Sequence, residues 1–444
     1  MTELHDLTVA EAARAIRERE VSAEELMSAL LAVCSELERH LNVWVTLDED
    51  AALEAARLRD RELASEGPRG PLHGVPVGVK DIYYTQGVLT TACSKILADF
   101  VPDFDATAVS KLRQAGAVIM GKTVTTEFAC GDPPPTRNPW NHAHTPGGSS
   151  SGSAVGVIAK MFPAALGSQT GGSVLRPAAY NGVVGLKPTF GRISRYGVVP
   201  VSASLDTMGH YGRTVEDTAM LLDAMSGYDP NDPGSVDAQI PNYHAASLAP
   251  QSAPRIGLVR THFWEKATEE TQEHADSIAR QFAEAGAVVE DIELSPDPFD
   301  DMLWAHRILM STEGADFHRE WFVDRADDYS PKVRVMIEDG LQVSAVDYLK
   351  AKDVQAAFTR DVTEAMRPFD VVMTPSTPSS APRDLSTTGD PMFQSPFTFG
   401  GFPTITLPSG FDSNAMPLGV QLGTPHWEEA KLLSVAAWAE GILD

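Results

Sequence analysis

Two serine–glycine turns and one lysine are the residues of this sequence whose types and spacing could do chemistry. The turns are Gly-Gly-Ser-Ser at residues 147–150 and Thr-Gly-Gly-Ser at residues 170–173, so Ser149 and Ser173 lie 24 residues apart (173 − 149 = 24). Lys80 precedes both turns and stands among valines. A serine hydroxyl becomes a good nucleophile when a base takes its proton, and burial can lower a lysine pKa enough for the neutral amine to be that base. The three residues therefore predict a Ser-Ser-Lys hydrolase site.

Each of these features also has a simpler structural interpretation. Residues 147–152 are compatible with a flexible linker, whereas a P-loop is excluded because no Gly-Lys-Ser/Thr ends the run. Lys80 and its neighbour Asp81 are compatible with a surface ion pair, although the apolar residues around them favour burial. Residues 170–173 are compatible with an ordinary glycine turn. Such a turn also lets several backbone N–H groups point at one spot, as an oxyanion hole requires.

The helices and strands that must position these residues alternate along the chain. Capping boxes at residues 8–11 and 22–25 predict two helices at the start. The alternation beyond them predicts an α/β fold with a mixed or parallel sheet covered by helices. The first elements expected after the opening helices are a strand at residues 75–79, a helix at 106–115 and a strand at 117–120.

Later segments continue this alternation with longer interruptions. Residues 131–153 are predicted to be a loop that places the first serine turn just before a helix. Residues 227–254, rich in Pro, Asp, Asn and Ser, are predicted to be a surface connection. The elements expected beyond it are a βαβ-like unit over 256–289, a helix around 302–310, charged segments to about 367, a strand at 371–373 and a Ser/Thr/Pro-rich loop over 375–396.

The composition indicates an ordinary globular chain with an acidic surface. Its 444 residues are 43% hydrophobic and 22% charged, enough to bury a substantial core. Lys plus Arg number 35 against 61 Asp plus Glu, and the formal net charge of −26 would repel phosphate backbones and anionic membranes. We therefore expect no nucleic-acid partner and no membrane partner.

The cysteines and the N-terminal residues indicate a cytoplasmic location. Three widely spaced cysteines fit neither a disulfide framework nor a zinc site, so no metal site is expected. Residues 1–20 have no unbroken apolar run and are predicted to be a helix of the mature protein rather than a signal peptide. No segment approaches the ~18 to 20 apolar residues of a membrane span. A soluble cytoplasmic protein is therefore expected.

Six motifs in a fixed order make the chain resemble the amidase signature family. Motifs of this length, in this order, are highly specific, and they are densest between about residues 70 and 225. The motifs are Gly-Val-Pro-Val-Gly-Val-Lys-Asp at 74–81, Pro-Gly-Gly-Ser-Ser at 146–150, Gln-Thr-Gly-Gly-Ser-Val at 169–174, Gly-Val-Val-Gly-Leu-Lys-Pro-Thr at 182–189, Ser-Leu-Asp-Thr at 204–207 and Pro-Leu-Gly-Val-Gln-Leu at 417–422.

The resemblance implies one large α/β domain over residues 1–444, with a central mixed sheet covered by helices on both faces. Within it we expect an N-terminal helical segment at 1–70, a catalytic core at 71–225, a variable substrate-pocket region at 226–400 and a C-terminal return to the core at 401–444. The resemblance implies that the protein needs no cofactor, neither a metal nor an organic group. Many members form homodimers, so a homodimer is compatible with the resemblance.

The resemblance also assigns roles to the residues of both turns. Ser173 would be the nucleophile, Lys80 the base and Ser149 the serine that relays the proton between them. The peptide bond between Gly148 and Ser149 would be cis, and Ser150 would support the loop by hydrogen bonding. The N–H groups of the second turn would stabilise the oxyanion; these are the N–H groups of Thr170, Gly171, Gly172 and Ser173.

Three residues depart from the common pattern near the nucleophile. Gln169 stands where many members have Asp, and Arg176 follows Ser173 by three residues where others place Arg after two. Thr398 stands where the amidotransferase members often have Asn. Arg176 could bind a substrate carboxylate, and a structural salt bridge is an equally good interpretation.

Other departures are interpreted as differences in the substrate pocket. His210-Tyr211 replaces the usual proline and apolar pair, and Cys93 and Cys130 occupy positions that are often small. Substrate choice is expected to depend on residues 302–322 and on the loop at 375–402. The side chains of that loop that could form an apolar mouth are Met392, Phe393, Phe397 and Phe399, although packing onto the core is an equally good interpretation.

The function implied is hydrolysis of amide-type C–N bonds in small or aryl amides, with carbamates (urethanes) and esters as further substrates. Water and a small-molecule amide or carbamate would be the partners. The alternative is the glutaminase component, or A chain, of a tRNA-dependent amidotransferase, which frees ammonia from glutamine with the same three residues. The substitutions at Gln169, Arg176 and Thr398 favour the free-standing hydrolase. A catalytically inactive binding protein is disfavoured, because Lys80, Ser149 and Ser173 are all present.

Overall fold

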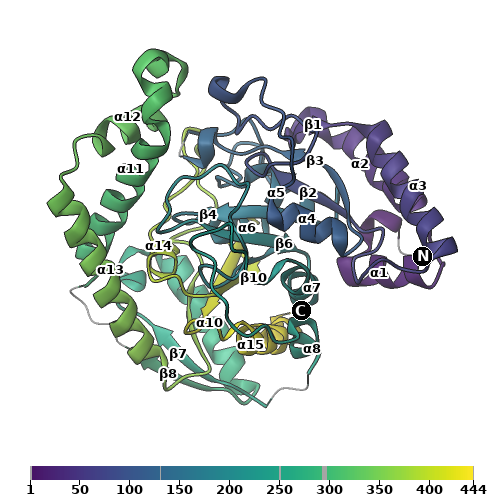
Figure 1. The fold of residues 1–444 in the computed structure, drawn as a ribbon. Helices are drawn as coiled ribbons and strands as arrows, with labels where there is room; N and C mark the ends of the chain where they lie inside the picture. Colours follow the sequence, from purple (N-terminus) through teal and green to yellow (C-terminus); the bar gives the residue numbers. More distant parts are fainter. Residues whose placement is uncertain (1–2, 131, 250–251, 293–297, 444) are drawn as a thin grey trace.

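One mixed sheet of eleven strands runs through the residues that the structure describes, and Figure 1 shows it at the centre of the molecule. The computed structural model describes residues 3–130, 132–249, 252–292 and 298–443. The strand order is β1-β3-β2-β4-β6-β5-β10-β11-β9-β7-β8. The bounds are β1 Trp44–Leu47, β2 Pro76–Lys80, β3 Val118–Thr123, β4 Ala164–Gln169, β5 Val184–Lys187, β6 Thr207–Gly212, β7 Arg255–Val259, β8 Val288–Ile292, β9 Val371–Pro375, β10 Thr404–Phe411 and β11 Pro417–Gly423.

Parallel strand pairs flank an antiparallel centre. Strand β2 is parallel to both β3 and β4, and β7 is parallel to both β8 and β9. The strands from β4 through β6, β5, β10 and β11 to β9 are antiparallel to their neighbours. Every residue of β2, β4, β5 and β6 is buried, so both faces of the sheet are covered there. The expected α/β fold with a central mixed sheet is confirmed.

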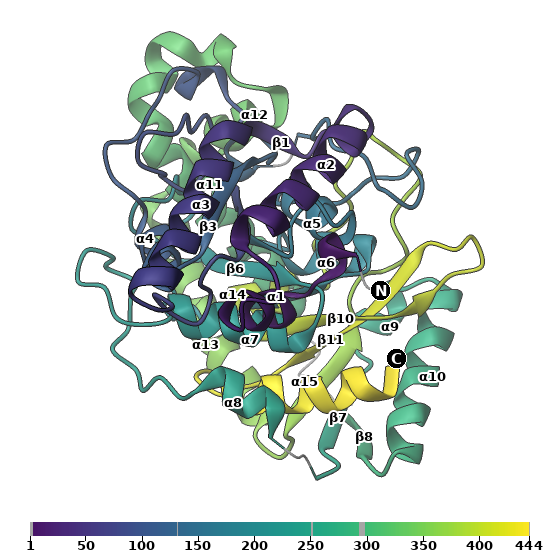
Figure 2. The ribbon, with the colours of Figure 1, turned by 90° about the vertical axis from the view of Figure 1, so that its right-hand side faces the viewer.

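Helices surround this sheet and gather in groups. Figure 1 shows α11, α12 and α13 at one margin of the molecule, opposite α1, α2 and α3, and Figure 2 shows α15 close to α8. The bounds are α1 Val9–Arg17, α2 Ala23–Leu41, α3 Glu49–Ser65, α4 Thr107–Gln114, α5 Ser151–Ile158, α6 Leu175–Asn181, α7 Val215–Met225, α8 Tyr243–Leu248, α9 Phe263–Lys266, α10 Glu269–Glu284, α11 Pro298–Arg325, α12 Pro331–Gly340, α13 Ala345–Met366, α14 Ser395–Phe399 and α15 Glu429–Leu443.

Local sequence signals explain where several helices begin. Thr8 and Ser22 form the two predicted capping boxes: the side chain of each accepts a hydrogen bond from the N–H of the glutamate three residues later, which bonds back. Helix α5 begins directly after the first serine turn, as predicted. None of the described helices combines the length and apolar content needed to span a bilayer.

Two sequence-based expectations need correction. The stretch at 227–254 is not only a connection, because it contains α8, which Asn242 caps and which buries Tyr243. The charged segments up to 367 are the helices α12 and α13. Their sequences carry few apolar residues because each buries only a narrow stripe, including Val333 and Ile337 in α12. A narrow stripe weakens the helical periodicity that the prediction used.

Candidate active site

The sheet brings Lys80 next to the chain segment that carries the second serine turn. Strands β2 and β4 are parallel neighbours, with Val79 paired to Leu166, so their carboxyl ends lie at the same edge. Lys80 is the last residue of β2, and the turn at 170–173 follows Gln169, the last residue of β4. The first serine turn approaches from the start of α5, which packs on both β2 and β4.

Lys80 makes hydrogen bonds to two serine hydroxyls. Its Nζ lies 2.7 Å from Oγ of Ser149 and 2.8 Å from Oγ of Ser168, and its side chain is fully buried. Burial lowers the pKa of Lys80 to about 7, because the charged ammonium loses its hydration. The neutral amine is therefore well populated near neutral pH. The contact with Ser168 was not predicted from the sequence.

The first turn is held by its own hydroxyls and by a neighbouring loop. The peptide bond between Gly148 and Ser149 is cis. The Ser149 carbonyl accepts a hydrogen bond from the N–H of Thr126 at 3.2 Å. Oγ of Ser150 bonds both the N–H and the carbonyl of Ser168 at 3.3 Å. These bonds fit the supporting role expected of Ser150.

Arg176 holds the two turns side by side. Its Nη2 donates to the carbonyl of Gly148 at 2.7 Å and to Oγ1 of Thr388 at 3.1 Å. The side chain is buried, and no carboxylate of the described residues pairs with it. The salt-bridge interpretation of Arg176 is therefore wrong. Because the guanidinium binds the carbonyl of the cis peptide itself, it acts on the position of Ser149.

The carbonyls of the second turn all point at hydrogen-bond donors. The carbonyl of Thr170 accepts from Nε2 of His306 at 2.8 Å, and that of Gly171 from Oγ1 of Thr398 at 2.6 Å. The carbonyl of Gly172 accepts from the N–H of Arg176 at 2.9 Å. The C=O and N–H of a trans peptide point in opposite directions, so the N–H groups of Gly171, Gly172 and Ser173 point away from these partners.

Those three N–H groups are available for a ligand. Within the described part of the chain, none of them donates a hydrogen bond to a protein acceptor. Ser173 itself is largely buried and retains 9% of its surface. Backbone N–H groups without a protein acceptor, next to a candidate nucleophile, are the donors that an oxyanion hole would use. No hydrogen bond joins Ser149 to Ser173 among the described residues, and such relay bonds are often long in substrate-free sites.

Gln169 and Thr398, two of the departures from the family pattern, contact each other. Oε1 of Gln169 accepts from the N–H groups of Val174 and Leu175 at 2.8 and 3.0 Å. Its Nε2 donates to Oγ1 of Thr398 at 2.9 Å, and the same hydroxyl donates to the carbonyl of Gly171. An aspartate at 169 could not donate to Thr398, so the two substitutions act together on the turn.

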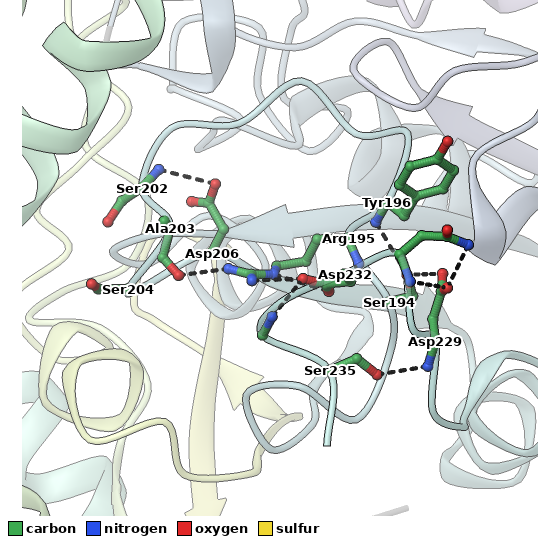
Figure 3. Close-up of polar contacts among 12 residues, drawn as sticks. Ser194, Arg195, Tyr196, Ser202, Ala203, Ser204, Asp206, Asp229, Asp232 and Ser235 are labelled. Carbon is green, nitrogen blue, oxygen red and sulfur yellow. Dashed lines mark hydrogen bonds and ion pairs between the residues drawn. The ribbon is translucent and has the colours of Figure 1, made fainter. Parts of the chain in front are cut away.

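A buried aspartate supports the turn from behind. Oδ1 of Asp206 accepts from Oγ1 of Thr170 at 2.6 Å, and Oδ2 accepts from the N–H of Ser202 at 3.0 Å. Burial raises the pKa of Asp206. Figure 3 shows Asp206 beside Ser202, and Arg195 between the carboxylate of Asp232 and the carbonyl of Ala203. The loop between β5 and β6 is thereby tied down where it meets the site.

Two cavities border the turns. One of about 460 Å³ includes Cys93, Thr126 and Tyr329 and lies beside the first turn. The other, of about 490 Å³, includes His306, Pro391 and Ser395, whose atoms lie within 4 Å of the place where a side chain at Gly171 would start. The second cavity lies between α11, α12 and the loop that precedes α14.

The expected apolar mouth is only partly correct. Phe393, Phe397 and Phe399 are buried in a core cluster with Phe263 and other residues, so for these three the interpretation as core residues is right. Met392 is half-buried and lines the cavity that contains His306. Some residues of this loop lie in the core and others line the cavity. The amino-acid composition of the loop does not show which residue takes which place.

The other suspected pocket residues have different environments. His210 is not in the pocket: it lies in β6 and its Nε2 contacts the carbonyl of Thr218 at 2.8 Å. Tyr211 donates from its hydroxyl to the carbonyl of Ser173 at 3.1 Å. Cys93 lines a cavity, whereas Cys130 is buried. Among the residues with described positions, no group of three His, Cys, Asp or Glu side chains could hold a metal ion.

The fold and the site together define a class of α/β proteins in which a mixed sheet buries a lysine against the serine of a Gly-Gly-Ser-Ser turn. A family model described as Amidase matches residues 25–433. The chain belongs to this family, and it is therefore an enzyme of amide C–N bond chemistry, by hydrolysis or by amidotransfer.

Similar proteins of known structure or function include both kinds of enzyme. The chain is 35% identical to the A chain of the glutamyl-tRNA(Gln) amidotransferase of Desulfatibacillum aliphaticivorans, over 97% of this chain and 96% of that protein. The peptide amidase of Stenotrophomonas maltophilia is 30% identical with a TM-score of 0.87, over 98% of this chain and 96% of that one. A 6-aminohexanoate cyclic dimer hydrolase is 27% identical with a TM-score of 0.89, over 100% and 98% of the chains.

Proposed function

We propose that this chain is a free-standing serine hydrolase that cleaves amide-type C–N bonds in small or aryl amides, and also carbamates and esters. The observation that carries the proposal is the contact of a fully buried Lys80 with Oγ of Ser149 at 2.7 Å. A lysine in that position can take a proton from a serine because burial lowers its pKa to about 7. The partners are then water and a small-molecule substrate.

The proposed reaction begins with attack by Ser173. Its Oγ forms a bond to the carbonyl carbon while its proton passes to Ser149 and the proton of Ser149 passes to Nζ of Lys80. The tetrahedral intermediate then collapses, and the proton on Lys80 returns through Ser149 to the leaving nitrogen as the C–N bond breaks. The product is an acyl group on Ser173 and a free amine.

Water completes the cycle by the same route. It attacks the acyl carbon while Ser149 and Lys80 take its proton, and Ser173 leaves with that proton restored. A carbamate substrate would give a carbamic acid, which loses carbon dioxide. In both halves the oxyanion accepts hydrogen bonds from the turn at 170–173, and each such donor contributes ~3 to 4 kcal/mol in enzymes of known mechanism.

Ser168 has a supporting role in this scheme. It receives one N–H of Lys80 at 2.8 Å, which leaves the lone pair of the neutral amine free to face Ser149. Arg176 and Tyr211 hold the backbones of Gly148 and Ser173, so they position the relay rather than take part in it.

The second candidate function is the glutaminase component of a tRNA-dependent amidotransferase. The similarity to the A chains of such amidotransferases over nearly the whole sequence favours it. The pair formed by Gln169 and Thr398 supports the hydrolase instead, because it replaces the residues expected in that component. The acidic net charge of −26 also disfavours direct tRNA contact.

A release assay on the purified chain tests the proposal. The substrates are a p-nitroanilide, a p-nitrophenyl carbamate, a small aliphatic amide and glutamine, with Ser173→Ala and Lys80→Ala as variants. Ser247→Ala in α8 is the matched control, because this largely buried serine lies outside the site and donates a hydrogen bond to the carbonyl of His244. Release from the anilide or the carbamate that both site variants abolish supports the hydrolase. Activity confined to glutamine, or dependent on a partner protein, supports the amidotransferase component.

A further inference from the structure

His306 connects the long helix α11 to the turn that carries Ser173. Its Nε2 lies 2.8 Å from the carbonyl oxygen of Thr170. A carbonyl oxygen only accepts hydrogen bonds, so Nε2 must carry the hydrogen. Burial lowers the pKa of His306, so the ring is neutral at neutral pH. In a neutral imidazole with hydrogen on Nε2, the other nitrogen is an acceptor with a free lone pair.

That acceptor, Nδ1, faces the cavity of about 490 Å³. No residue with a described position donates a hydrogen bond to it. Because Nδ1 has no such donor and yet is not one of the fully inaccessible polar atoms, part of its surface is exposed. The open space that His306 borders is this cavity. An acceptor on a nearly buried ring, with no protein donor, is suited to a donor group on a ligand.

The rest of the cavity is mainly apolar around this acceptor. Leu303, Met310, Met336 and Met392 contribute apolar side chains, and the charged lining residues are Arg307 and Asp339, which pair with each other at 2.7 Å, together with Lys332 and Asp390. The hydroxyls of Ser311 and Ser395 already donate to backbone carbonyls, at 3.4 and 3.0 Å. A bound group would therefore be apolar, with a hydrogen-bond donor opposite the imidazole.

The cavity is also close to the reacting residues. Cε1 of His306 lies 3.8 Å from the position where a side chain at Gly171 would start, and Ser173 follows two residues later. A substrate that fills this cavity would therefore lie against the turn that carries Ser173.

We propose that Nδ1 of His306 accepts a hydrogen bond from an N–H group that lies a few bonds from the scissile carbonyl, and that the enzyme thereby selects apolar substrates with a second amide or carbamate N–H. This inference rests on the proposed function. It makes His306 a substrate-recognition residue, in the region of the chain that the sequence indicated for substrate choice. Simple alkyl amides without a second N–H would be poorer substrates.

A matched pair of substrates tests the inference. N-acetyl-phenylalanine p-nitroanilide has the second N–H, and its 2-acetoxy-3-phenylpropanoyl analogue has an ester oxygen in the same place. One hydrogen bond between neutral groups changes kcat/KM by roughly 3-fold to 10-fold. We therefore expect the ratio of kcat/KM for the N–H substrate to that for the ester analogue to be larger in the wild type than in His306→Gln by this factor. Glutamine can still donate to Thr170 from the position of Nε2, but it has no acceptor at the position of Nδ1.

The controls separate recognition from general damage. Ser247→Ala in α8 should leave the preference unchanged, because this side chain lies outside the cavity. An equal fall of both substrates in His306→Gln would overturn the inference, since it would show that His306 only holds Thr170. If His306→Gln fails to fold, calorimetry on Ser173→Ala protein decides: roughly 3-fold to 10-fold tighter binding of the N–H compound supports the inference, and equal affinities overturn it.

The same experiment separates this inference from the proposed function. Release from both substrates that depends on Ser173, with the same preference in wild type and His306→Gln, refutes only the role of His306. Absence of any Ser173-dependent release from either substrate refutes the hydrolase function itself.

Discussion

The pKa of Lys80 should set the acid limb of the pH profile. Burial lowers this pKa from 10.5 to about 7. At pH 8 a lysine with a pKa of 7 is about 90% neutral, whereas a lysine with its ordinary pKa is about 0.3% neutral, so burial provides about 300-fold more base. We therefore expect kcat/KM for an anilide substrate to rise as the pH approaches 7 and to level off above it.

A charge placed beside Lys80 should move this limb in a known direction. Oγ of Ser168 lies 2.8 Å from Nζ, so Ser168→Asp puts a carboxylate next to the amine. An opposite charge at this distance favours the ammonium and raises the pKa by about 1 to 3 units. At pH 7.5 the neutral fraction, and with it kcat/KM, should fall by about 3-fold to about 200-fold, and activity should return at higher pH.

Initial rates of p-nitroaniline release between about pH 5.5 and 10 measure both effects. Ser168→Asn is the matched control, because it has the size of the aspartate without its charge and should leave the midpoint near that of the wild type. A wild-type midpoint close to 10, or equal midpoints for the aspartate and asparagine variants, would refute the role of Lys80 as a buried base.

Three further outcomes are expected. Lys80→Met should remove a pH dependence of stability, because the unfolded state binds more protons than the folded state when the folded pKa is depressed. Between pH 6 and 9, chemical denaturation should show the free energy of unfolding of the wild type rising by about 2 to 3 kcal/mol relative to the variant. A constant difference would contradict the low pKa. Arg176→Met should lower kcat by about 10-fold to 100-fold with little change in KM, because it frees the carbonyl of Gly148; a rise of KM confined to anionic substrates would instead indicate carboxylate binding. Phe393→Ala should lower the free energy of unfolding by about 3 to 5 kcal/mol without changing substrate preference, whereas Met392→Ala should change KM with little loss of stability; the opposite pattern would reverse their assignments.

The sequence predicted the parts of the site that lie in continuous motifs. Lys80, Ser149 and Ser173 stand in short segments with strong local signals, and the sheet brings Lys80 and Ser149 together. Ser150 was expected to support the loop by hydrogen bonding, and its contacts with Ser168 span only 18 residues.

Contacts between distant segments could not be predicted in the same way. His306 reaches Thr170 across 136 residues, and Thr398 reaches Gly171 across 227 residues. Thr398 was noted only as a departure from the family pattern, and no local signal in α11 marks His306, because the contacts of both side chains depend on how the helices pack. The same reason explains Phe393, whose burial depends on Phe263 from another segment.

The strand order has a consequence for how the enzyme becomes active during synthesis. Strand β5 ends at Lys187, yet its neighbour β10 begins only at Thr404, so the sheet stays open until more than two hundred further residues have left the ribosome. Pairing across such a sequence distance is slow, because a long loop must close first. Although Lys80, Ser149 and Ser173 are made early, the donors that orient the turn come from α11 and α14. A nascent or truncated chain would therefore hold all three residues and yet lack the contacts that order the turn at 170–173.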